Sequence, residues 1–278
     1  MVKIVTDSSS DISPHTAAEL GITVVPVRIA FGAKTYYDGI DIDRSSFYHL
    51  VSKSPALPTV EPPLPGELHQ TYSQLLKGSD QILSIHSSSR LNKTVQVANE
   101  AAKVFLGRSK IAVIDSRMIS WGLELVVTMA AEAAARGSSI DEIVRLIRGM
   151  VPHIYMVFFA ESLEYLERRA HTGRGRMLME SLPGVRPLLI IEEGEIVPME
   201  KVRTRGKSID RLFEFVTEFA HFEQLAILQG RVSEEPQMLF QRLNEAFPDR
   251  RLDVRPYGPA LATHLGPDAL GVAVYEGM

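Results

Sequence analysis

Short apolar runs alternate with amphipathic segments along the first half of the chain. Each run has the length of a strand and ends in a turn rich in serine or aspartate, and a helical pattern follows it. The predicted strands cover 3–6, 81–86 and 111–114, and the predicted helices lie near 14–20, 92–106 and 119–136. Because strands that alternate with helices form parallel βαβ units, this half is predicted to be a Rossmann-like domain with a parallel sheet.

The segment between the first two of these units has a different pattern. A further strand is predicted at 24–31, followed by a turn-rich stretch at 38–43 and a short helix at 44–52. Five prolines fall within 55–65, so this stretch is predicted to be an extended loop of fixed conformation. A stiff loop loses little entropy when it becomes ordered, which suits the wall of a ligand site.

The second half mixes strands, hairpins and helices instead of repeating one unit. Glu193-Gly194 lies between two strand patterns and indicates a hairpin. Strands are predicted at 154–160, 187–191, 195–202, 225–229, 252–256 and 270–275, and helices near 162–169, 177–182, 208–219 and 234–247. This is an α+β pattern with a mixed sheet, so we predict two domains, 1–150 and 151–278.

The composition narrows the class of protein. The 278 residues are 45% hydrophobic and 23% charged, which is typical of a globular chain. The net charge of −4 argues against a general nucleic-acid binder, which carries a basic excess. Residues 168–207 nevertheless hold nine Lys/Arg against five Glu, so a local basic face is available on an acidic protein.

The chain has no cysteine, which excludes disulfides, zinc–thiolate sites and cysteine nucleophiles. Its first residues, MVKIVTDSSS, do not resemble a signal peptide. It has no apolar run of roughly 18 residues, the length that a membrane-spanning helix needs. We therefore expect a cytoplasmic protein without integral membrane insertion.

The serine-rich turns are the first candidates for a binding site. Ser8–Ser10, Ser87–Ser89 and the turn at 115–117 each follow a predicted parallel strand and open a helix. Ligands of open parallel sheets bind beyond the carboxyl ends of the strands, where helix amino termini favour anions. This predicts an anion site beside Ser87–Ser89 with Ser8–Ser10 nearby. The alternative is that these residues only cap helices.

Other candidate motifs are weaker. The basic turn at 203–208 lacks the first glycine of a phosphate-binding P-loop, because Lys201 occupies that position. His264, predicted in a Gly/Pro-bounded loop, and His86, at a strand end, could each pair with a carboxylate or simply pack. No hydrolase, zincin or dinucleotide motif and no EF-hand spacing is present, so neither a catalytic residue nor a metal site is predicted. The helix at 119–136 is apolar on more than one face, which indicates core burial or the wall of an apolar tunnel, with burial favoured.

A set of ordered motifs resembles the DegV family along most of the chain. These are Ile4-Val5-Thr6-Asp7-Ser8-Ser9-Ser10-Asp11, Val25-Pro26, Asp38-Gly39, Phe47-Tyr48, Pro58-Thr59, Pro65-Gly66-Glu67, Ser84-Ile85-His86, Ser88-Ser89, Asp115-Ser116-Arg117, Glu161-Ser162-Leu163-Glu164-Tyr165-Leu166, Lys201-Val202-Arg203-Thr204-Arg205, Gly258-Pro259, Thr263-His264-Leu265-Gly266-Pro267 and Ala269-Leu270-Gly271. Each motif alone is weak, but their order and spacing together are specific.

The resemblance implies a two-domain α/β fold of the DegV/EDD type that buries one long-chain fatty acid in an apolar tunnel between the domains. It implies that hydroxyls of the Pro-Thr loop and of the Ser-Ser turn, with the histidine of the Thr-His-x-Gly loop, hold the carboxylate near the surface. The matching positions are Thr59, Ser88, Ser89 and His264. No cofactor is implied besides this lipid.

Further residues are assigned by the same resemblance and by proximity. A second tier of site residues comprises Ser9, His86, Asn92 and Lys93. Some family members present the carboxylate to a fatty acid kinase, which forms an acyl phosphate for phospholipid metabolism. Arg203 matches an arginine tied to that partner step, and Arg205 is a further candidate for contact with the partner or a phosphate.

The sequence departs from the family pattern at the predicted site. Val60 replaces a second hydroxyl after Thr59, and Glu61 adds a negative charge that would repel a carboxylate if it faced the site. Asn92 and Lys93 replace Ser-Gly in the segment after the serines, and the usual Gly-Gly-Arg is replaced around 169–171. These changes bear on the head group and on the partner surface more than on the fold.

Three functions remain open on the sequence. The first is a non-catalytic fatty-acid carrier, which the resemblance and the absence of catalytic motifs favour. The second is an enzyme, a hydrolase or kinase subunit that uses the same Ser/His cluster. The third is a docking module that acts through the basic segment 168–207, and it is compatible with the first.

Overall fold

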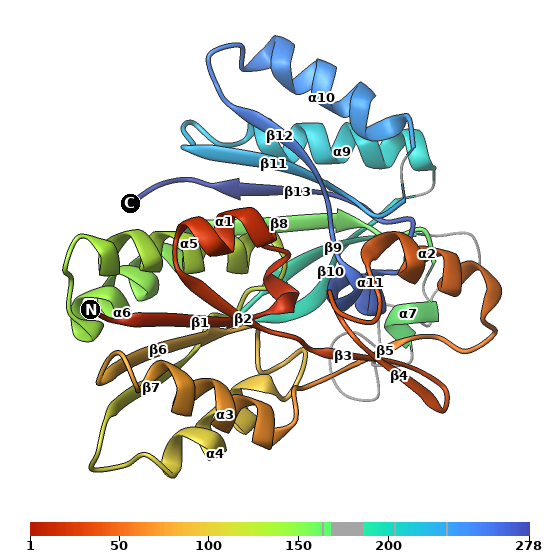
Figure 1. The fold of residues 1–278 in the computed structure, drawn as a ribbon. Coiled ribbons are helices and arrows are strands. Elements are labelled where there is room, and N and C mark those ends of the chain that lie inside the picture. Colours follow the sequence, from red (N-terminus) through yellow and green to blue (C-terminus); the bar gives the residue numbers. More distant parts are fainter. Residues whose placement is uncertain (163, 168–185, 203, 232) are drawn as a thin grey trace. The chain divides into compact units, whose positions relative to one another are not determined.

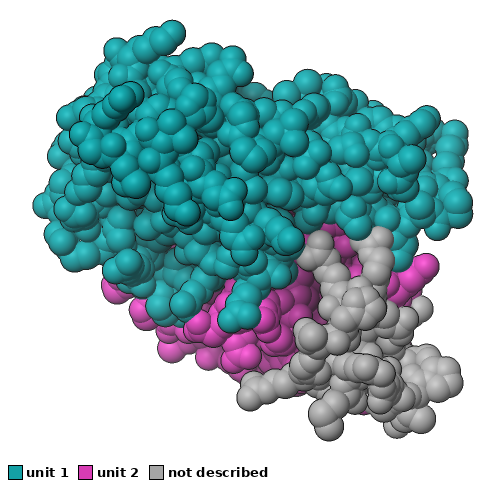
Figure 2. Space-filling view, turned by 90° about the horizontal axis from the view of Figure 1, so that it is seen from below, with its two compact units in different colours: residues 1–152 teal, residues 153–278 magenta. Residues whose placement is uncertain are grey.

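The computed structural model describes residues 1–278 except 163, 168–185, 203 and 232. The chain forms two compact units, residues 1–152 (unit 1) and 153–278 (unit 2), which Figure 2 colours separately. The mixed α/β fold predicted from the sequence is confirmed. The predicted helix at 177–182 lies outside the described residues.

Unit 1 is built on a four-stranded sheet in the order β2-β1-β6-β7, in which every pair is parallel. Its strands are β1 (Lys3–Asp7), β2 (Ile22–Val25), β6 (Gln81–His86) and β7 (Lys110–Asp115). The predicted strands at 3–6, 81–86 and 111–114 are therefore confirmed. Because β1, β6 and β7 are neighbours and run in one direction, their carboxyl ends share one edge of the sheet.

Helices cover both faces of this sheet (Figure 1). Helices α3 (Pro65–Leu75) and α4 (Thr94–Lys103) lie on one face, and α5 (Trp121–Ala135) and α6 (Ile140–Met150) lie on the other. Leu68 and Tyr72 of α3 pack with Ala98 of α4 against strand residues. The apolar helix α5 is buried on most of its surface, so the burial interpretation is confirmed. Helix α1 (Pro14–Glu19) follows the first serine turn.

The prediction of a single strand at 24–31 is wrong. The segment contains the end of β2 and the whole of β3 (Arg28–Phe31), and these strands belong to different sheets. Pro26 lies between them, and its lack of an N–H group prevents it from continuing a ladder. Strand β3 pairs with β4 (Lys34–Tyr37) and with β5 (Thr59–Glu61) in a three-stranded antiparallel sheet. The proline-rich segment 55–65 thus contains a short strand and is not only a loop.

Unit 2 contains a six-stranded sheet in the order β10-β9-β8-β13-β11-β12. The strands are β8 (Ile154–Phe159), β9 (Arg186–Glu192), β10 (Glu195–Val202), β11 (Gln224–Gln229), β12 (Leu252–Pro256) and β13 (Leu270–Tyr275). The β11–β12 pair is parallel and the other pairs are antiparallel, so the predicted mixed sheet is confirmed.

The hairpin between β9 and β10 turns at the predicted dipeptide. Glu193 and Gly194 have φ angles of 49° and 81°, as a two-residue turn that follows the strand twist requires. Farther along β10 the register shifts between Pro198 and Glu200, which marks a β-bulge. Strand β10 is the outermost strand of this sheet within the described part of the chain.

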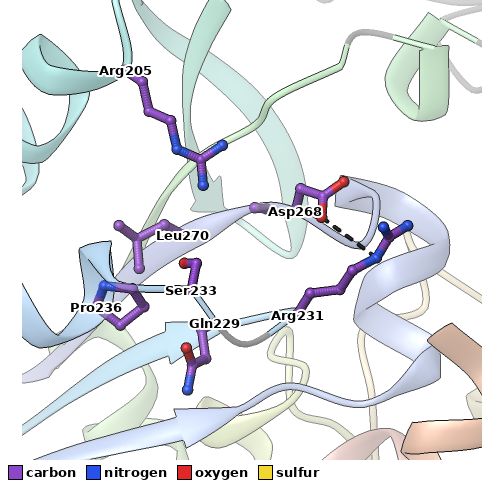
Figure 3. A pocket seen from close by; sticks show the side chains of 8 residues that line it. Arg205, Gln229, Arg231, Ser233, Pro236, Asp268 and Leu270 are labelled. Atoms are coloured by element: carbon purple, nitrogen blue, oxygen red, sulfur yellow. Dashed lines mark ion pairs between the residues drawn. The ribbon is translucent and has the colours of Figure 1, made fainter.

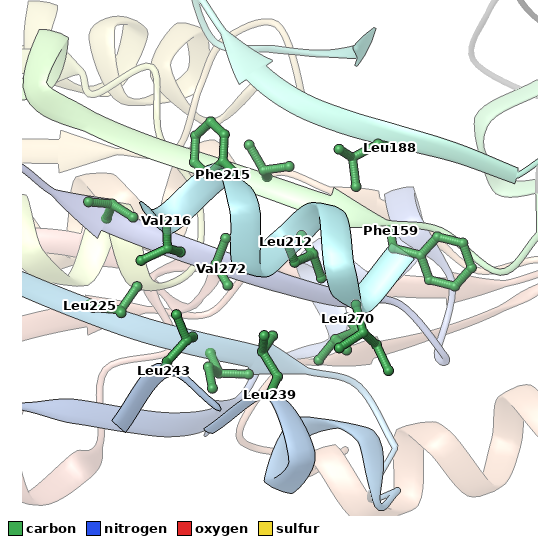
Figure 4. Packing of buried hydrophobic residues seen from close by; sticks show 14 of the residues in the cluster. Phe159, Leu188, Leu212, Phe215, Val216, Leu225, Leu239, Leu243, Leu270 and Val272 are labelled. Carbon is green, nitrogen blue, oxygen red and sulfur yellow. The ribbon is translucent and has the colours of Figure 1, made fainter. Parts of the chain in front are cut away.

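The core of unit 2 lies between this sheet and helices α9 (Arg205–Thr217) and α10 (Glu235–Ala246). Figure 4 shows Leu212 and Val216 of α9 and Leu239 of α10 against Leu225 and Val272 of the strands. These side chains are buried almost completely. No helix of the described residues is both long enough and apolar enough to cross a membrane.

Helix α9 begins with a side-chain cap that can be tested. The hydroxyl of Thr204 accepts a hydrogen bond from the Lys207 backbone N–H at 3.3 Å. We expect Thr204→Ala to lower the free energy of unfolding by about 1 kcal/mol, because an orphan N–H loses its partner. Urea denaturation measures this effect. Thr217→Ala, at the other end of the same helix, is the matched control and should change stability by less, so equal losses would contradict the cap.

Candidate functional site

Three acidic or imidazole side chains end three neighbouring strands of unit 1. Asp7 ends β1, His86 ends β6 and Asp115 ends β7. The serine turns follow directly, and Ser8–Ser10 forms a single 3-10 turn. The predicted gathering of these turns at one sheet edge therefore matches the observed strand order. The carboxylates of Asp7 and Asp115 also lie at this edge, so it is not lined by anion-binding groups alone.

Asp7 is the hub of this edge. It is fully buried and accepts hydrogen bonds from the backbone N–H of Ser9 at 3.0 Å and of Ser87 at 3.1 Å. Its second oxygen lies 2.9 Å from His86 Nδ1. Burial by itself would raise the pKa of Asp7, but the hydrogen bond and charge of His86, with the bonds from Ser9 and Ser87, bring it below its usual value. Asp7 is therefore ionised at neutral pH.

His86 continues a buried chain of hydrogen bonds away from the edge. Its Nε2 lies 2.7 Å from Ser84 Oγ, which accepts a hydrogen bond from the Tyr72 hydroxyl at 2.8 Å. Ser84, His86 and Asp7 thus have the order of a hydrolytic triad. All three side chains are fully buried, and the Ser84 oxygen already has two partners, so this serine is not placed to attack a substrate.

The hydroxyls of Ser89 and Ser88 have different hydrogen-bond partners. The Ser89 hydroxyl donates a short hydrogen bond to Asp115, and its backbone N–H lies 3.3 Å from both oxygens of that carboxylate. Its proton is therefore directed at Asp115. Ser88 is buried, and its hydroxyl accepts from the Arg90 N–H at 3.2 Å.

Asn92 links the second serine turn to helix α4. Its amide nitrogen donates to Ser87 Oγ at 2.8 Å, and its oxygen accepts from the Thr94 N–H at 2.8 Å. Asn92 thus connects the Ser87 side chain to the first residue of α4. Its neighbour Lys93 is exposed at the start of that helix. A lysine at this position adds a cation next to the turn.

Several buried hydroxyls at this edge have no hydrogen-bond partner among the described residues. They are Thr6 Oγ1, Ser9 Oγ and Thr94 Oγ1. An unpaired buried polar atom carries a desolvation cost, which a bound water or ligand atom can relieve. Of the second-tier residues, Ser9 is thus the one whose side chain still has a hydrogen bond to make.

A second carboxyl group lies behind the first serine turn. Asp38 is buried, and burial raises its pKa to about 7 in spite of a hydrogen bond from Ser8. The charges of Asp11 and Asp7 act in the same direction as burial, and that of Arg44 acts against it. Sequence reasoning assigned Asp38 to a turn and missed this environment, because its partners come from a distant segment.

Thr59 begins strand β5, beside Ala30 of β3. It is partly exposed, and its hydroxyl makes no hydrogen bond with the described residues, so it is available to a ligand. The nearby Glu61 forms an ion pair with Arg28 at 3.2 Å, and Arg28 also donates to the Pro62 carbonyl at 3.0 Å. The negative charge that Glu61 adds is thus balanced by a cation.

His264 lies in unit 2, in helix α11 (Pro259–Leu265). The prediction of a loop between two strands is therefore wrong. Pro259 suits the first position of a helix, and Gly266, with φ of 83°, ends it. The Tyr165 ring of helix α7 (Glu164–Glu167) packs so closely on Gly266 that a side chain there would crowd it. His264 itself is buried.

Arg205 lines a cavity of about 150 Å³ in unit 2, together with Gln229, Arg231 and Asp268 (Figure 3). Its guanidinium contacts Glu161 at 2.8 Å and Glu235 at 2.7 Å, and Arg231 lies 3.5 Å from Asp268. Three carboxylates thus accompany two arginines, which makes the cavity a balanced polar site and not a strongly cationic one. Arg203, the other predicted partner contact, lies outside the described residues.

The described residues contain no group of three or more His, Cys, Asp or Glu side chains arranged to hold a metal ion. The residues that sequence reasoning missed are Asp7, Ser84 and Tyr72, which form the buried chain with His86. Ser84 and His86 alternate on one strand and so share a face, which was a usable signal. Their pairing with Asp7 depends on the strand order and could not be read locally.

The parallel sheet with its polar edge and the mixed six-stranded sheet define a two-unit α/β protein. The family model described as "Uncharacterised protein, DegV family" matches residues 1–277, and the chain belongs to the DegV family. A DegV domain-containing protein of Deinococcus radiodurans is 30% identical over 276 residues and is aligned over 98% of each chain. Protein DegV of Bacillus subtilis is 30% identical over 275 residues, with 98% of each chain covered.

Solved structures agree with this assignment. The crystal structure of DegV, a fatty acid binding protein from Bacillus subtilis, superposes with a TM-score of 0.89 at 29% identity and 99% coverage of each chain. A fatty acid binding DegV family protein from Streptococcus agalactiae has a TM-score of 0.90 at 25% identity, covering 100% of this chain and 99% of its own. The resemblance seen in the sequence is confirmed.

Proposed function

We propose that this protein binds one long-chain fatty acid and acts as a carrier in the cytoplasm. The observation that carries the proposal is the agreement, along the whole chain, with DegV family structures described as fatty acid binding. A chain of 16 to 18 carbons would gain much of its affinity from burying methylenes, at about 0.8 kcal/mol each. The proposed acyl site is an apolar tunnel that opens at the polar groups named above.

The carboxylate is proposed to be held by Thr59, Ser88 and Ser89 of unit 1 and by His264 of unit 2. The available hydroxyl of Thr59 supports this assignment, and so does the pairing of Glu61 with Arg28. Ser89 would have to turn its proton from Asp115 toward the ligand, so Thr59, Ser88 and His264 are proposed as the main donors. Ser9, with its unpaired hydroxyl, and Lys93 are proposed as supporting contacts.

Lipid analysis tests the first part of the proposal. Protein purified from its natural or a heterologous host is extracted with organic solvent, and the extract is examined by mass spectrometry. We expect one fatty acid per chain, or saturable uptake of added palmitate by stripped protein. The absence of lipid in repeated preparations, together with no uptake of palmitate or oleate, would exclude the carrier function.

Substitution of Thr59 tests the head-group site. Thr59→Val keeps the β-branched shape but removes the hydroxyl, so we expect palmitate to bind about tenfold more weakly, the loss of one charge-assisted hydrogen bond. Thr35→Val, on exposed strand β4 of the same small sheet, is the matched control and should bind like wild type. Equal affinities of the two variants in a fluorescence competition assay would remove Thr59 from the site.

We further propose that the bound carboxylate is presented to a separate fatty acid kinase, with Arg203 and Arg205 near the contact. The basic excess of 168–207 supports an electrostatic component. Acyl phosphate formation from ATP and loaded protein, in the presence of a candidate kinase, is the assay. Binding of that kinase should weaken with salt and with Arg203→Glu, and indifference to both would exclude this surface.

A further inference from the structure

A single buried carboxylate connects the two serine turns of unit 1. Asp7 receives the N–H of Ser9 from the turn at 8–10 and the N–H of Ser87 from the turn at 87–89, at 3.0 and 3.1 Å. Ser87 is 80 residues away from Asp7 in sequence. Without Asp7 both N–H groups would be buried beside each other with no carboxylate acceptor, so each turn depends on it for its position.

The same carboxylate determines where His86 carries its proton. An ionised carboxylate can only accept, so the imidazole atom 2.9 Å away, Nδ1, must donate. On the other side, Ser84 Oγ accepts from Tyr72, and its own proton is within reach of His86 Nε2 at 2.7 Å. All hydrogen bonds can then run in one direction, from Tyr72 through Ser84 and His86 to Asp7.

The register of the sheet creates this chain. Val5 of β1 lies beside Ser84 of β6, so the residues two positions farther along, Asp7 and His86, also lie beside each other. From Asp7 the order continues through Ser87 to Asn92, whose amide donates to the Ser87 hydroxyl at 2.8 Å. The carboxylate therefore acts on the first residue of the second serine turn and, through the Ser87 side chain, on Asn92.

We propose that Asp7 is the positioning residue of the ligand site. It holds the His86 proton on Nδ1 and accepts hydrogen bonds from the Ser9 and Ser87 N–H groups. These contacts fix both serine turns in the positions that bind the head group. The assignment of those turns to the head group rests on the proposed function. Asp7 itself is buried away from solvent and acts through the turns, not by contact with the ligand.

The wild-type protein provides the first test without any ligand. Nitrogen chemical shifts of the His86 imidazole, from ¹⁵N-labelled protein stripped of lipid, report which nitrogen carries the proton. We expect a protonated Nδ1, with slow solvent exchange of the Ser9 and Ser87 amide protons. A proton on Nε2 alone, or fast exchange of both amides, overturns the proposal.

The second test is Asp7→Asn, which keeps the shape but replaces one acceptor by a donor. The His86 proton is expected to move to Nε2, and palmitate affinity, measured where the variant is folded by circular dichroism, to fall about tenfold, the loss expected for a charge-assisted bond. If Asp7 contributed only to stability, the folded Asp7→Asn variant would bind palmitate with wild-type affinity. A folded Asp7→Asn protein with wild-type affinity therefore overturns the proposal.

Asp141→Asn is the control, because it makes the same chemical change at an exposed carboxylate of helix α6, which pairs with Lys110 and has no part in the Asp7 contacts. It should keep the Nδ1 proton and bind palmitate within about twofold of wild type, a difference below 1 kcal/mol. If Asp7→Asn does not fold, the wild-type proton position and amide exchange decide the proposal. If wild-type protein takes up no fatty acid, the proposed function fails. The imidazole measurement then still decides whether Asp7 holds the His86 proton on Nδ1.

Discussion

Replacing Gly230 by alanine is expected to lower the free energy of unfolding of unit 2 by about 3 kcal/mol or more, at the upper end of overpacking effects. A β-carbon at this position would lie 1.9 Å from the Pro267 carbonyl oxygen and 2.5 Å from the Tyr257 hydroxyl. The first of these atoms belongs to the backbone, so the clash cannot be relieved by a side-chain rotation. Two loops would have to separate.

The separation would break contacts around helix α11. The Arg231 N–H donates to the Pro267 carbonyl at 2.8 Å, and the Tyr257 hydroxyl donates to the Gly266 carbonyl at 2.8 Å. Both bonds fix the chain that follows His264. We therefore expect Gly230→Ala to weaken palmitate binding as well as stability.

Urea denaturation followed by circular dichroism measures the loss of stability. Gly206→Ala is the matched control, because no atom lies within 4 Å of its added β-carbon and the residue is helical in α9. Alanine there should stabilise the helix by roughly 0.5–1 kcal/mol. A Gly230→Ala protein as stable as wild type would show that the two loops do not approach as closely as described.

Asp38→Asn is expected to change the pH dependence of stability more than any exposed carboxyl substitution. Burial is the main cause of its pKa of about 7, compared with 3.8 for an unhindered aspartate, so the folded protein holds this proton more tightly than the unfolded chain. The stability that it contributes is fully present below the unfolded pKa and is lost as the pH rises through the folded pKa. The whole change amounts to at most about 4 kcal/mol.

The amide that replaces the carboxyl group in this variant does not titrate, so the variant should lose this dependence. As the pH rises from about 4 to about 8, Asp38→Asn should become more stable relative to wild type, by up to about 4 kcal/mol. Urea unfolding of both proteins at a series of pH values and constant ionic strength measures the difference. Stability curves that stay parallel over this range would mean that Asp38 titrates alike in the folded and unfolded protein.

The regular elements of this fold could be predicted because their signals are local. Strands β6 and β13 have the predicted bounds, and the hairpin turns at Glu193-Gly194 as its dipeptide indicates. The strand predicted at 24–31 failed because hydrophobicity continues across Pro26, whereas the ladder does not. Helix α11 was missed because Gly258-Pro259 was taken as a loop boundary, although proline is favoured at the first helical position.

The candidate site was predicted only at the level of which turns meet. Ser8–Ser10 and Ser87–Ser89 could be placed on one edge, because parallel strands align their carboxyl ends. The partners of those serines could not be predicted, since the Asp7–His86 contact joins residues 79 positions apart. Likewise, the direction of the Ser89 hydroxyl toward Asp115 depends on the β6–β7 pairing and not on any motif.

Strand β10, with its bulge at Pro198–Glu200, has a consequence for how molecules of this protein meet each other. Proline offers no N–H to an incoming strand, and the bulge interrupts the regular spacing that another chain would have to match. Glu195, Glu200 and Lys201 add charge along the same margin. Intermolecular sheet extension, the first step of many aggregates, is thereby discouraged at this border of unit 2.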